Sequence, residues 1–348
     1  MSRKLLSYTA IGLILGSTAI ADVPKVAVDI APVHSLVSRV MEGVGSPKLI
    51  IPAGASPHEY SLRPSEAKSL QDADMVIWIG EDLAPWMKKS IETLTKNAEV
   101  ITLLEESDTK LLDFREGALF EEHDHGEHDD HDDHDDHDEH DHDKDHDDHD
   151  NHDDHDDHNH DKNHDDHDDH EDHDGHAHGE HDPHAWLSTE NAQTWLNLVA
   201  GKLSAADPEN AGVYFANAAA AREEINDLVK EVNSILEPVR GRNFVVFHDA
   251  YQYFETSFDF PAAGAISLSD ATDPSAARIA EIQDRVKDEG INCVLSEPQF
   301  NANLVETVIS GTDAKTGVID PLGLGLEPGP KLYGDLIRNM GKALAGCL

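Results

Sequence analysis

Short apolar runs alternate along the chain with segments of helical period. Each run is nearly continuous in apolar residues, as expected of strands buried on both faces of a sheet. The predicted strands span residues 25–30, 74–80, 99–104, 243–249, 292–297 and 316–321. Helical candidates such as 65–73 and 276–289 lie between them. This alternation predicts parallel α/β sheets with helices on both faces.

One helical segment is longer than the others. It starts at Asp207, a preferred capping residue, and Pro208, which suits the first helical position. Apolar residues then recur on one face of the helix: Tyr214, Ala218, Ala221, Ile225, Leu228, Val232 and Ile235. The pattern predicts a helix that ends near Leu236, before Pro238. Periodicity alone leaves two roles open, a rigid connector between two halves or a surface helix of one half.

Residues 121–181 break the α/β pattern with repeated HDD units. They hold 31 acidic side chains, two lysines and 21 of the 25 histidines of the chain. Because the segment has almost no apolar side chains to bury, we expect a disordered surface insertion over 116–182. A tract rich in histidine and aspartate is typical of metal binding, and a solvated acidic linker is the alternative.

The insertion also dominates the charge. The 348 residues carry a formal net charge of −45, and outside 121–181 there are 40 acidic and 24 basic side chains. What remains is a moderately acidic globular chain, long enough for two lobes. Such a balance argues against nucleic acid or an anionic membrane surface as a partner.

The first 21 residues have the pattern of a signal peptide. Arg3 and Lys4 precede a short apolar run, and the small-residue sequence 19–21 suits cleavage. The run is too short and too interrupted to span a bilayer comfortably, so we expect export, with a retained N-terminal anchor as the alternative. In an exported protein, the two cysteines Cys293 and Cys347 favour a disulfide over two buried free thiols.

Four histidines lie outside the insertion. His58 lies in a turn-rich stretch after the predicted strand KLIIPAG at 48–54, His184 where globular sequence resumes, and His248 at the end of a predicted strand. Asp320 ends another strand. Ligands of open parallel sheets collect beyond the carboxyl ends of the strands, and three imidazoles with one carboxylate suit a first-row transition metal, zinc above all. His34 lies in the apolar APVHSLV, and we assign it a structural role. Taken alone, any one of the four histidines could have such a role, because hydrogen bonds are enough to satisfy an imidazole.

The motifs around these residues are SPHEY, DPHAWLS, VVFHDAYQYFE, LSEPQF and GVIDPLG. In content and order they resemble the metal-binding proteins of bacterial ABC importers, and among these the zinc-uptake, or ZnuA, type. The resemblance covers about residues 26–347 and is broken only by the insertion. A long acidic His-rich loop before the second ligand motif and a disulfide in the second lobe are also features of the zinc members.

The resemblance implies two parallel-sheet α/β lobes joined by one long rigid helix, with a metal ion in the cleft between the lobes. The implied organisation is a signal peptide at 1–21, an N-terminal lobe at 22–206 that includes the insertion 116–182, a connecting helix at 207–237 and a C-terminal lobe at 238–348. The resemblance thereby favours the connector role for the long helix.

Carried over by motif, the metal ligands are His58, His184 and His248, with Asp320 in the fourth position. Manganese-binding relatives present a carboxylate where His248 stands, so the residue favours zinc.

Some zinc members have an acidic residue directly before the first histidine ligand. Pro57 occupies that place here and Glu59 follows the histidine, which weakens this alternative for the fourth ligand; water is another. Glu297 ends a strand and is a candidate acceptor for the second N–H of a ligating histidine.

The resemblance implies a periplasmic protein, not an enzyme, that captures one Zn²⁺ and passes it to an inner-membrane ABC permease. A zinc hydrolase is the rival, because three nitrogens and an open fourth position also describe catalytic zinc. No HExxH or other local catalytic signature supports it. A metal-storage protein or adhesin of the same fold is a further alternative. We expect a monomer, with a periplasmic zinc chaperone as an additional partner, and weaker exchangeable zinc sites on the insertion.

Overall fold

The computed structural model describes residues 23–115, 120, 181–267, 274–300 and 302–348. The predicted signal peptide and nearly all of the predicted insertion lie outside these residues. Within the described part of the chain, no helix is both long and apolar enough to cross a membrane.

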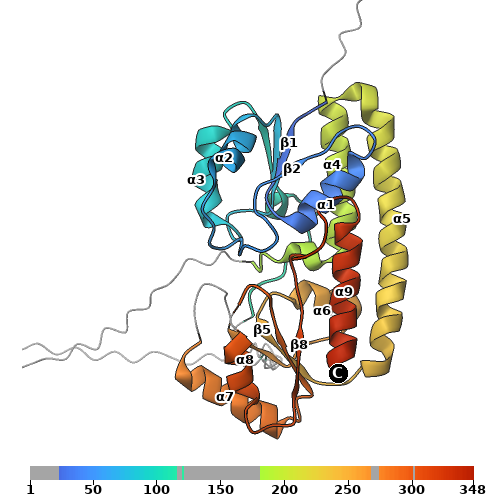
Figure 1. Cartoon of the computed structure of the whole chain (residues 1–348). Coiled ribbons are helices and arrows are strands. Elements are labelled where there is room, and N and C mark those ends of the chain that lie inside the picture. Colours follow the sequence, from blue (N-terminus) through green and yellow to red (C-terminus); the bar gives the residue numbers. More distant parts are fainter. Residues whose placement is uncertain (1–22, 116–119, 121–180, 268–273, 301) are drawn as a thin grey trace, which may run out of the picture. The chain divides into compact units, whose positions relative to one another are not determined.

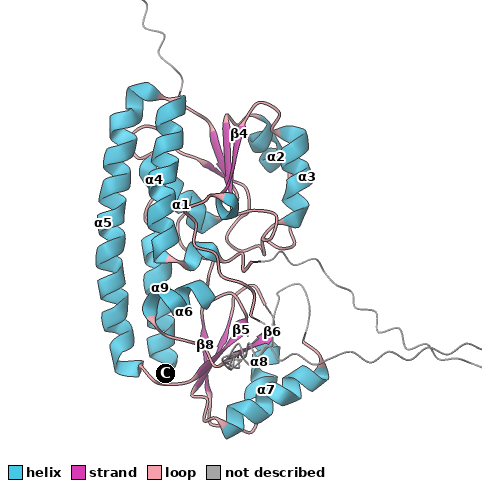
Figure 2. Ribbon diagram, turned by 180° about the vertical axis from the view of Figure 1, so that it is seen from behind, coloured by secondary structure: helices cyan, strands magenta, loops and turns pink. Residues whose placement is uncertain are grey.

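The first lobe is built on a four-stranded parallel sheet with the strand order β2-β1-β3-β4 (Figure 1). The strands are β1 (Val26–Val28), β2 (Lys48–Leu49), β3 (Met75–Trp78) and β4 (Glu99–Thr102). The central strands β1 and β3 are buried at every position because helices cover both faces. In both views α2 and α3 lie on one side of the sheet and α1 and α4 on the other (Figures 1 and 2). These helices are α1 (Ala31–Val40), α2 (Pro64–Gln71), α3 (Pro85–Leu94) and α4 (Thr189–Ala206).

The second lobe repeats this topology, with the strand order β6-β5-β7-β8. Its strands are β5 (Phe244–His248), β6 (Gly264–Ser267), β7 (Cys293–Ser296) and β8 (Lys315–Val318). Helices α7 and α8 lie on one side of this sheet, over a small core of their own, and α6 and α9 lie on the other (Figure 2). These helices are α6 (Gln252–Phe258), α7 (Ala276–Asp288), α8 (Ala302–Ile309) and α9 (Leu332–Cys347).

A long helix, α5 (Ala211–Leu236), follows the short 3₁₀ turn Pro208–Asn210. It packs against α1 and α4 of the first lobe and also against α9 of the second (Figure 1). The predicted apolar stripe is its buried face, except at the end, where Leu236 is buried and Ile235 is only partly so. Because one helix contributes to the packing of both lobes, it is a connector and not a surface helix of one half.

Three features of the sheets differ from the sequence prediction. Strands β4 and β8 lie at sheet edges and are not buried on both faces, since Val100 is 40% and Val318 60% exposed. An edge strand has only one neighbour and is open to solvent on its free side. Strand β6 was not predicted, because its GAIS sequence has little β-propensity, yet it pairs with β5 through Val246 and Ala265.

The predicted disulfide between Cys293 and Cys347 is confirmed. It joins β7 to the last turn of α9 across a sequence separation of 54 residues, and both cysteines are buried. The bridge fixes the end of the chain to a central strand of the second lobe.

Candidate metal site

Three histidines from distant parts of the sequence meet at one point. His58, His184 and His248 each offer a ring nitrogen, and these nitrogens all lie within 4.8 Å of one another. The ring centroid of His184 lies 5.4 Å from that of His58 and 5.3 Å from that of His248. Within the described part of the chain, these three side chains are therefore placed to hold one metal ion together.

His184 is oriented by a carboxylate two residues earlier in the chain. Its Nδ1 lies 2.7 Å from Oδ1 of Asp182, which also accepts from the His184 backbone N–H at 2.9 Å. Burial raises the pKa of Asp182 to about 7. A carboxylate at Nδ1 places the imidazole proton there and directs the Nε2 lone pair outward, as in many metal sites.

His184 is also fixed by the segment that follows it. Ser188 caps helix α4, with its hydroxyl oxygen accepting from the backbone N–H of Asn191. The indole N–H of Trp186 donates to the carbonyl oxygen of Pro321 at 2.9 Å, which ties this segment to the second lobe.

His248 is the last residue of β5 and is backed by a carboxylate from a neighbouring strand. Its Nδ1 lies 2.6 Å from Oε1 of Glu297, the residue that directly follows β7. Both side chains are buried. This contact confirms Glu297 as the predicted acceptor, and it leaves Nε2 of His248 as the nitrogen available to a metal.

His58 lies in the loop after β2. Its backbone N–H donates to the hydroxyl oxygen of Ser56, and the indole N–H of Trp86 in α3 donates to the carbonyl oxygen of Pro57 at 2.8 Å. Trp86 thereby anchors the loop to the helical layer of the first lobe, next to the position of the first histidine.

The three histidines line a cavity of about 20 Å³. The other lining residues are Ser56, Pro57, Trp186, Glu297, Gln299, Phe300, Pro321 and Leu322. A cavity needs roughly 10–15 Å³ to hold one water molecule, so this one has room for a single ion. Three imidazoles around so small a space, two of them buried, suit a borderline-soft ion such as Zn²⁺.

The structure does not bring Asp320 into the histidine group. Its Oδ1 accepts hydrogen bonds from the backbone N–H groups of Leu322 and Gly323, both at 3.0 Å, and from Nε2 of Gln299 at 3.3 Å. Asp320 itself does not line the cavity, whereas Gln299 does. Glu59, the weaker sequence alternative, is exposed and also lies outside the lining.

His34 lies away from the other three histidines and has the structural role predicted for it. It is buried in α1, where its Nε2 lies 3.2 Å from the carbonyl oxygen of Pro47. Burial lowers its pKa, so the ring is held neutral.

Comparison with known families accounts for nearly the whole chain. The family model for ZnuA, the zinc-uptake complex component A of the periplasm, matches residues 26–347. The chain belongs to the ZnuA family.

Individual ZnuA relatives agree with this assignment. The chain is 47% identical to the high-affinity zinc uptake system protein ZnuA of Brucella abortus, over 96% of this chain and 94% of that one. It is also 47% identical to the Paracoccus denitrificans protein of the same name, over 96% and 95%.

Solved structures share the fold. A crystal structure of ZnuA superimposes with a TM-score of 0.67 at 19% identity, covering 94% of this chain and 99% of that one. The Zn(II)-bound ZnuA-like domain of Streptococcus pneumoniae AdcA gives 0.62 at 23% identity, covering 93% and 98%.

In this ZnuA family member the sequence did not reveal a buried ion cluster beside the site. Arg115 donates to both carboxylate oxygens of Asp249, the residue after His248, and to Glu255 of α6 at 2.8 and 3.1 Å. Its guanidinium also lies 3.5 Å from the ring centroid of Phe120. A lone arginine before an acidic insertion gives no sequence signal, because its partners lie more than 130 residues away.

Tyr253 holds together the two chain segments that flank the insertion. Its hydroxyl group accepts from the backbone N–H of Leu112 and donates to the carbonyl oxygen of Asp182, both at 3.0 Å. Tyr253 belongs to α6, so the second lobe fixes the segment that carries Asp182 and His184.

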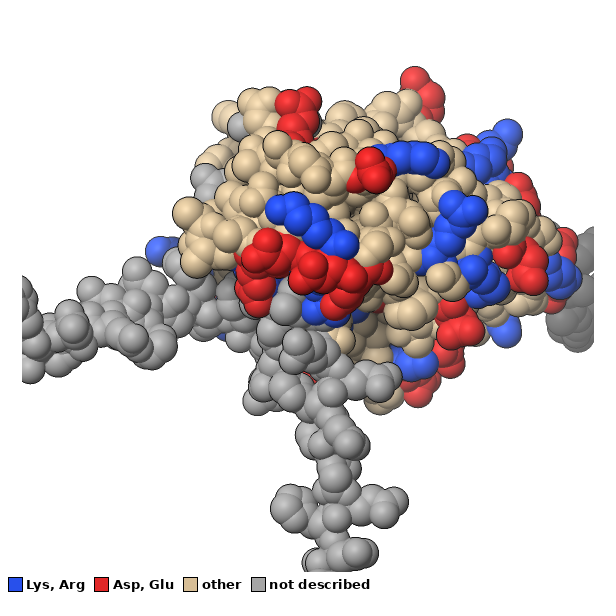
Figure 3. Space-filling model, turned by 90° about the horizontal axis from the view of Figure 1, so that it is seen from below, with Lys and Arg blue, Asp and Glu red and all other residues tan. Residues whose placement is uncertain are grey.

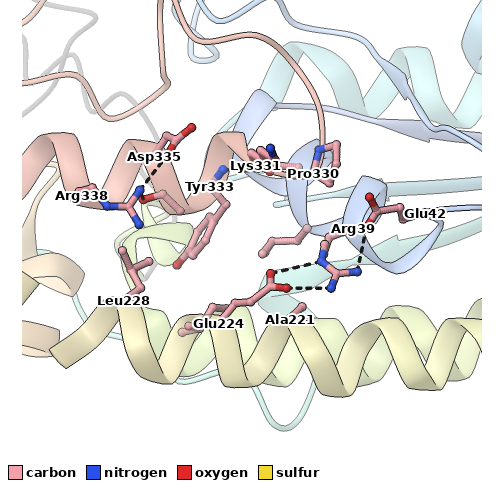
Figure 4. A pocket seen from close by; sticks show the side chains of 14 residues that line it. Arg39, Glu42, Ala221, Glu224, Leu228, Pro330, Lys331, Tyr333, Asp335 and Arg338 are labelled. Carbon is pink, nitrogen blue, oxygen red and sulfur yellow. Dashed lines mark hydrogen bonds and ion pairs between the residues drawn. The ribbon is translucent and has the colours of Figure 1, made fainter. Parts of the chain in front are cut away.

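A larger cavity of about 430 Å³ lies between α1, α5 and α9. Most of its charged side chains pair with one another: Arg39 donates to Glu224 and Glu42, and Arg338 donates to Asp335 (Figure 4). No histidine or cysteine lines it. The cavity therefore offers no ligand set for a transition metal.

Figure 3 shows the surface of the protein from below the view of Figure 1. In the described part of the chain drawn there, basic and acidic side chains are interspersed, without a continuous basic stripe (Figure 3). This charge distribution differs from the basic surface that nucleic-acid binding requires.

Proposed function

We propose that this ZnuA family member is the zinc-binding component of a bacterial ABC importer. It captures Zn²⁺ between its lobes in the periplasm and delivers the ion to an inner-membrane permease. The observation that carries the proposal is the meeting of His58, His184 and His248 around a cavity of about 20 Å³. The three imidazoles are the direct ligands, and Asp320, predicted for the fourth position, acts on it from outside the cavity lining.

Two properties of the site support capture of an ion over catalysis. The cavity of about 20 Å³ matches a single ion, and two of the histidines are oriented by buried carboxylates at 2.6 and 2.7 Å. Locked neutral imidazoles bind metal without rearrangement and release it when they are protonated. Zinc affinity should therefore fall as the pH falls through the histidine range.

The remaining proposals concern the rest of the chain. Residues 1–21 are the export signal, 22–206 and 238–348 the two lobes, and 207–237 the connector. The protein acts as a monomer, with a periplasmic zinc chaperone as a further partner. The 21 histidines of residues 121–181 add weaker, exchangeable zinc sites, because a segment without a preformed geometry loses part of the coordination energy to ordering.

The direct test is to remove one ligand from a protein that lacks residues 121–180. In that background His248→Ala should weaken zinc binding by more than about 100-fold, beyond the range seen when groups behind a ligand are removed. Zinc affinity would be measured by competition with a chelator.

His34→Ala in the same background is the matched control, because His34 is buried but lies outside the site. It should leave the zinc affinity within about threefold of the parent, within the usual scatter of such measurements. An unchanged affinity in the His248→Ala protein would refute the assignment.

A further inference from the structure

Gln299 connects the two lobes beside the histidines. It follows β7 by three residues, and its Nε2 donates to the carbonyl oxygen of Ala53 at 3.4 Å and to Oδ1 of Asp320 at 3.3 Å. Ala53 lies in the loop between β2 and His58, whereas Asp320 follows β8. One amide group therefore contacts a ligand-bearing loop of the first lobe and the carboxylate of the second.

These contacts fix the orientation of the amide. A carbonyl oxygen and a carboxylate oxygen can only accept hydrogen bonds, so the NH₂ group must face both. The amide oxygen, Oε1, then points elsewhere. It is buried and has no hydrogen-bond partner among the described residues.

Such an oxygen is uncommon, because buried polar atoms almost always have a partner. Gln299 lines the cavity of the three histidines, and Asp320 does not. The amide of Gln299 thus lies between the Asp320 carboxylate and the three histidines, and its Oε1 accepts no hydrogen bond from the described residues.

We propose that a water molecule fills the fourth coordination position of the zinc, that Gln299 Oε1 accepts a hydrogen bond from this water, and that Asp320 acts on the position through Gln299. The proposal rests on the proposed zinc-binding function and specifies its fourth position. Amide oxygens are not among the usual zinc ligands, whereas a zinc-bound water is a strong hydrogen-bond donor. Oε1 therefore accepts from a water molecule on the ion, and Asp320 holds the amide in place.

A double-mutant cycle tests this chain of contacts. In the protein without residues 121–180, Gln299→Met removes the acceptor while keeping the volume, and Asp320→Ala removes the group behind it. Each single variant should weaken zinc binding by about 10–100-fold, the usual effect of losing a group behind a ligand. The double variant should bind no more weakly than the poorer single variant, because the two residues act in series.

A spectroscopic readout separates this role from loss of fold. The visible spectrum of bound Co²⁺ reports on the ligand field, so Gln299→Met and Asp320→Ala should change the spectrum in the same way. Gln193→Met is the matched control, since Gln193 is also half-buried but bonds to Asn226 between α4 and α5. It should change neither the zinc affinity nor the spectrum.

Two results would overturn the inference. Losses that add in the double variant would mean that Asp320 reaches the zinc independently of Gln299. A Gln299→Met protein with the parent's affinity and spectrum would mean that Oε1 does not face the ion. In both cases the parent protein would still bind zinc through its histidines, so failure of this inference is distinct from failure of the proposed function, which the His248→Ala variant tests.

Discussion

In the second lobe, the residues at and beside the candidate metal site come at strand ends: His248 closes β5, Glu297 follows β7, and Asp320 comes shortly after β8. In the first lobe, which has the same strand topology, neither histidine directly ends a strand. His58 lies in the loop after β2, and His184 lies beyond the insertion. The second lobe thus positions its groups by its sheet, and the first by loops that other contacts must hold.

The difference shows how each histidine obtains its acceptor. His184 bonds to Asp182, two residues away, whereas His248 bonds to Glu297, 49 residues away, across adjacent strands. A ligand on a rigid strand can rely on a neighbouring strand. His184, on a loop, has its acceptor two residues away, and both loops are held by outside contacts, Tyr253 at Asp182 and Trp86 at Pro57.

The largest expected effect concerns the sheet of the second lobe. Replacing both Cys293 and Cys347 by alanine should lower the free energy of unfolding by about 4 kcal/mol, the loop-closure value for a separation of 54 residues. Zinc affinity at 25 °C should persist, because no disulfide atom lines the site. Urea unfolding gives the first quantity and chelator competition the second.

Reducing agent should destabilise the parent and leave the double variant unchanged. A loss below about 1 kcal/mol, under the usual range for native disulfides, would show that the small core of α7 and α8 sustains the lobe alone.

The second effect concerns the two acceptors. Asp182→Asn and Glu297→Gln should each weaken zinc binding by about 10–100-fold, because each histidine loses the carboxylate that orients it and raises its basicity. Chelator competition on the protein without residues 121–180 measures both. Glu237→Gln, on an exposed glutamate, is the control and should have no effect.

If only one of the two variants lost zinc affinity, the local acceptor Asp182 and the cross-strand acceptor Glu297 would not have the same role. Additive losses in the double variant are expected, since the two carboxylates contact different histidines.

The third effect appears only in the pH dependence of stability and concerns the position after the first strand of each lobe. Asp249 follows β5 and pairs with Arg115, whereas Asp29 follows β1 and accepts from the backbone N–H groups of Ile30 and Ile79, both at 2.7 Å. Burial raises the pKa of Asp29 to about 7 from 3.8, so the folded protein takes up a proton that the unfolded chain releases. Its contribution to stability is complete below about pH 3.8 and is lost as the pH rises through 7.

Asp29→Asn should therefore reduce the decline of unfolding free energy between pH 4 and pH 7 by about 1.4 kcal/mol per pH unit. Urea unfolding over this pH range measures it. Asp227→Asn, on an exposed residue of α5, should leave the slope unaltered. Equal slopes for the Asp29→Asn protein and its parent would mean that the carboxyl group is ionised in the folded state.

The sequence by itself determined the elements whose signals are local. Continuous apolar runs marked six of the strands, and the three-and-four spacing from Tyr214 marked α5, because burial repeats with the period of the element. The motifs also singled out the three histidines that meet. The sequence did not predict strand β6, because its few small residues are held by pairing with β5 and not by their own β-propensity.

Tertiary structure decided what depends on residues far apart in the chain. Which strands form edges, and so leave Val100 and Val318 exposed, follows from the strand order and not from the apolar run itself. Arg115 meets Asp249, and Gln299 meets both Ala53 and Asp320, across separations of 134, 246 and 21 residues. Hydrogen bonds and ion pairs require contact within a few ångströms but no sequence period, so only the folded chain could bring these groups together.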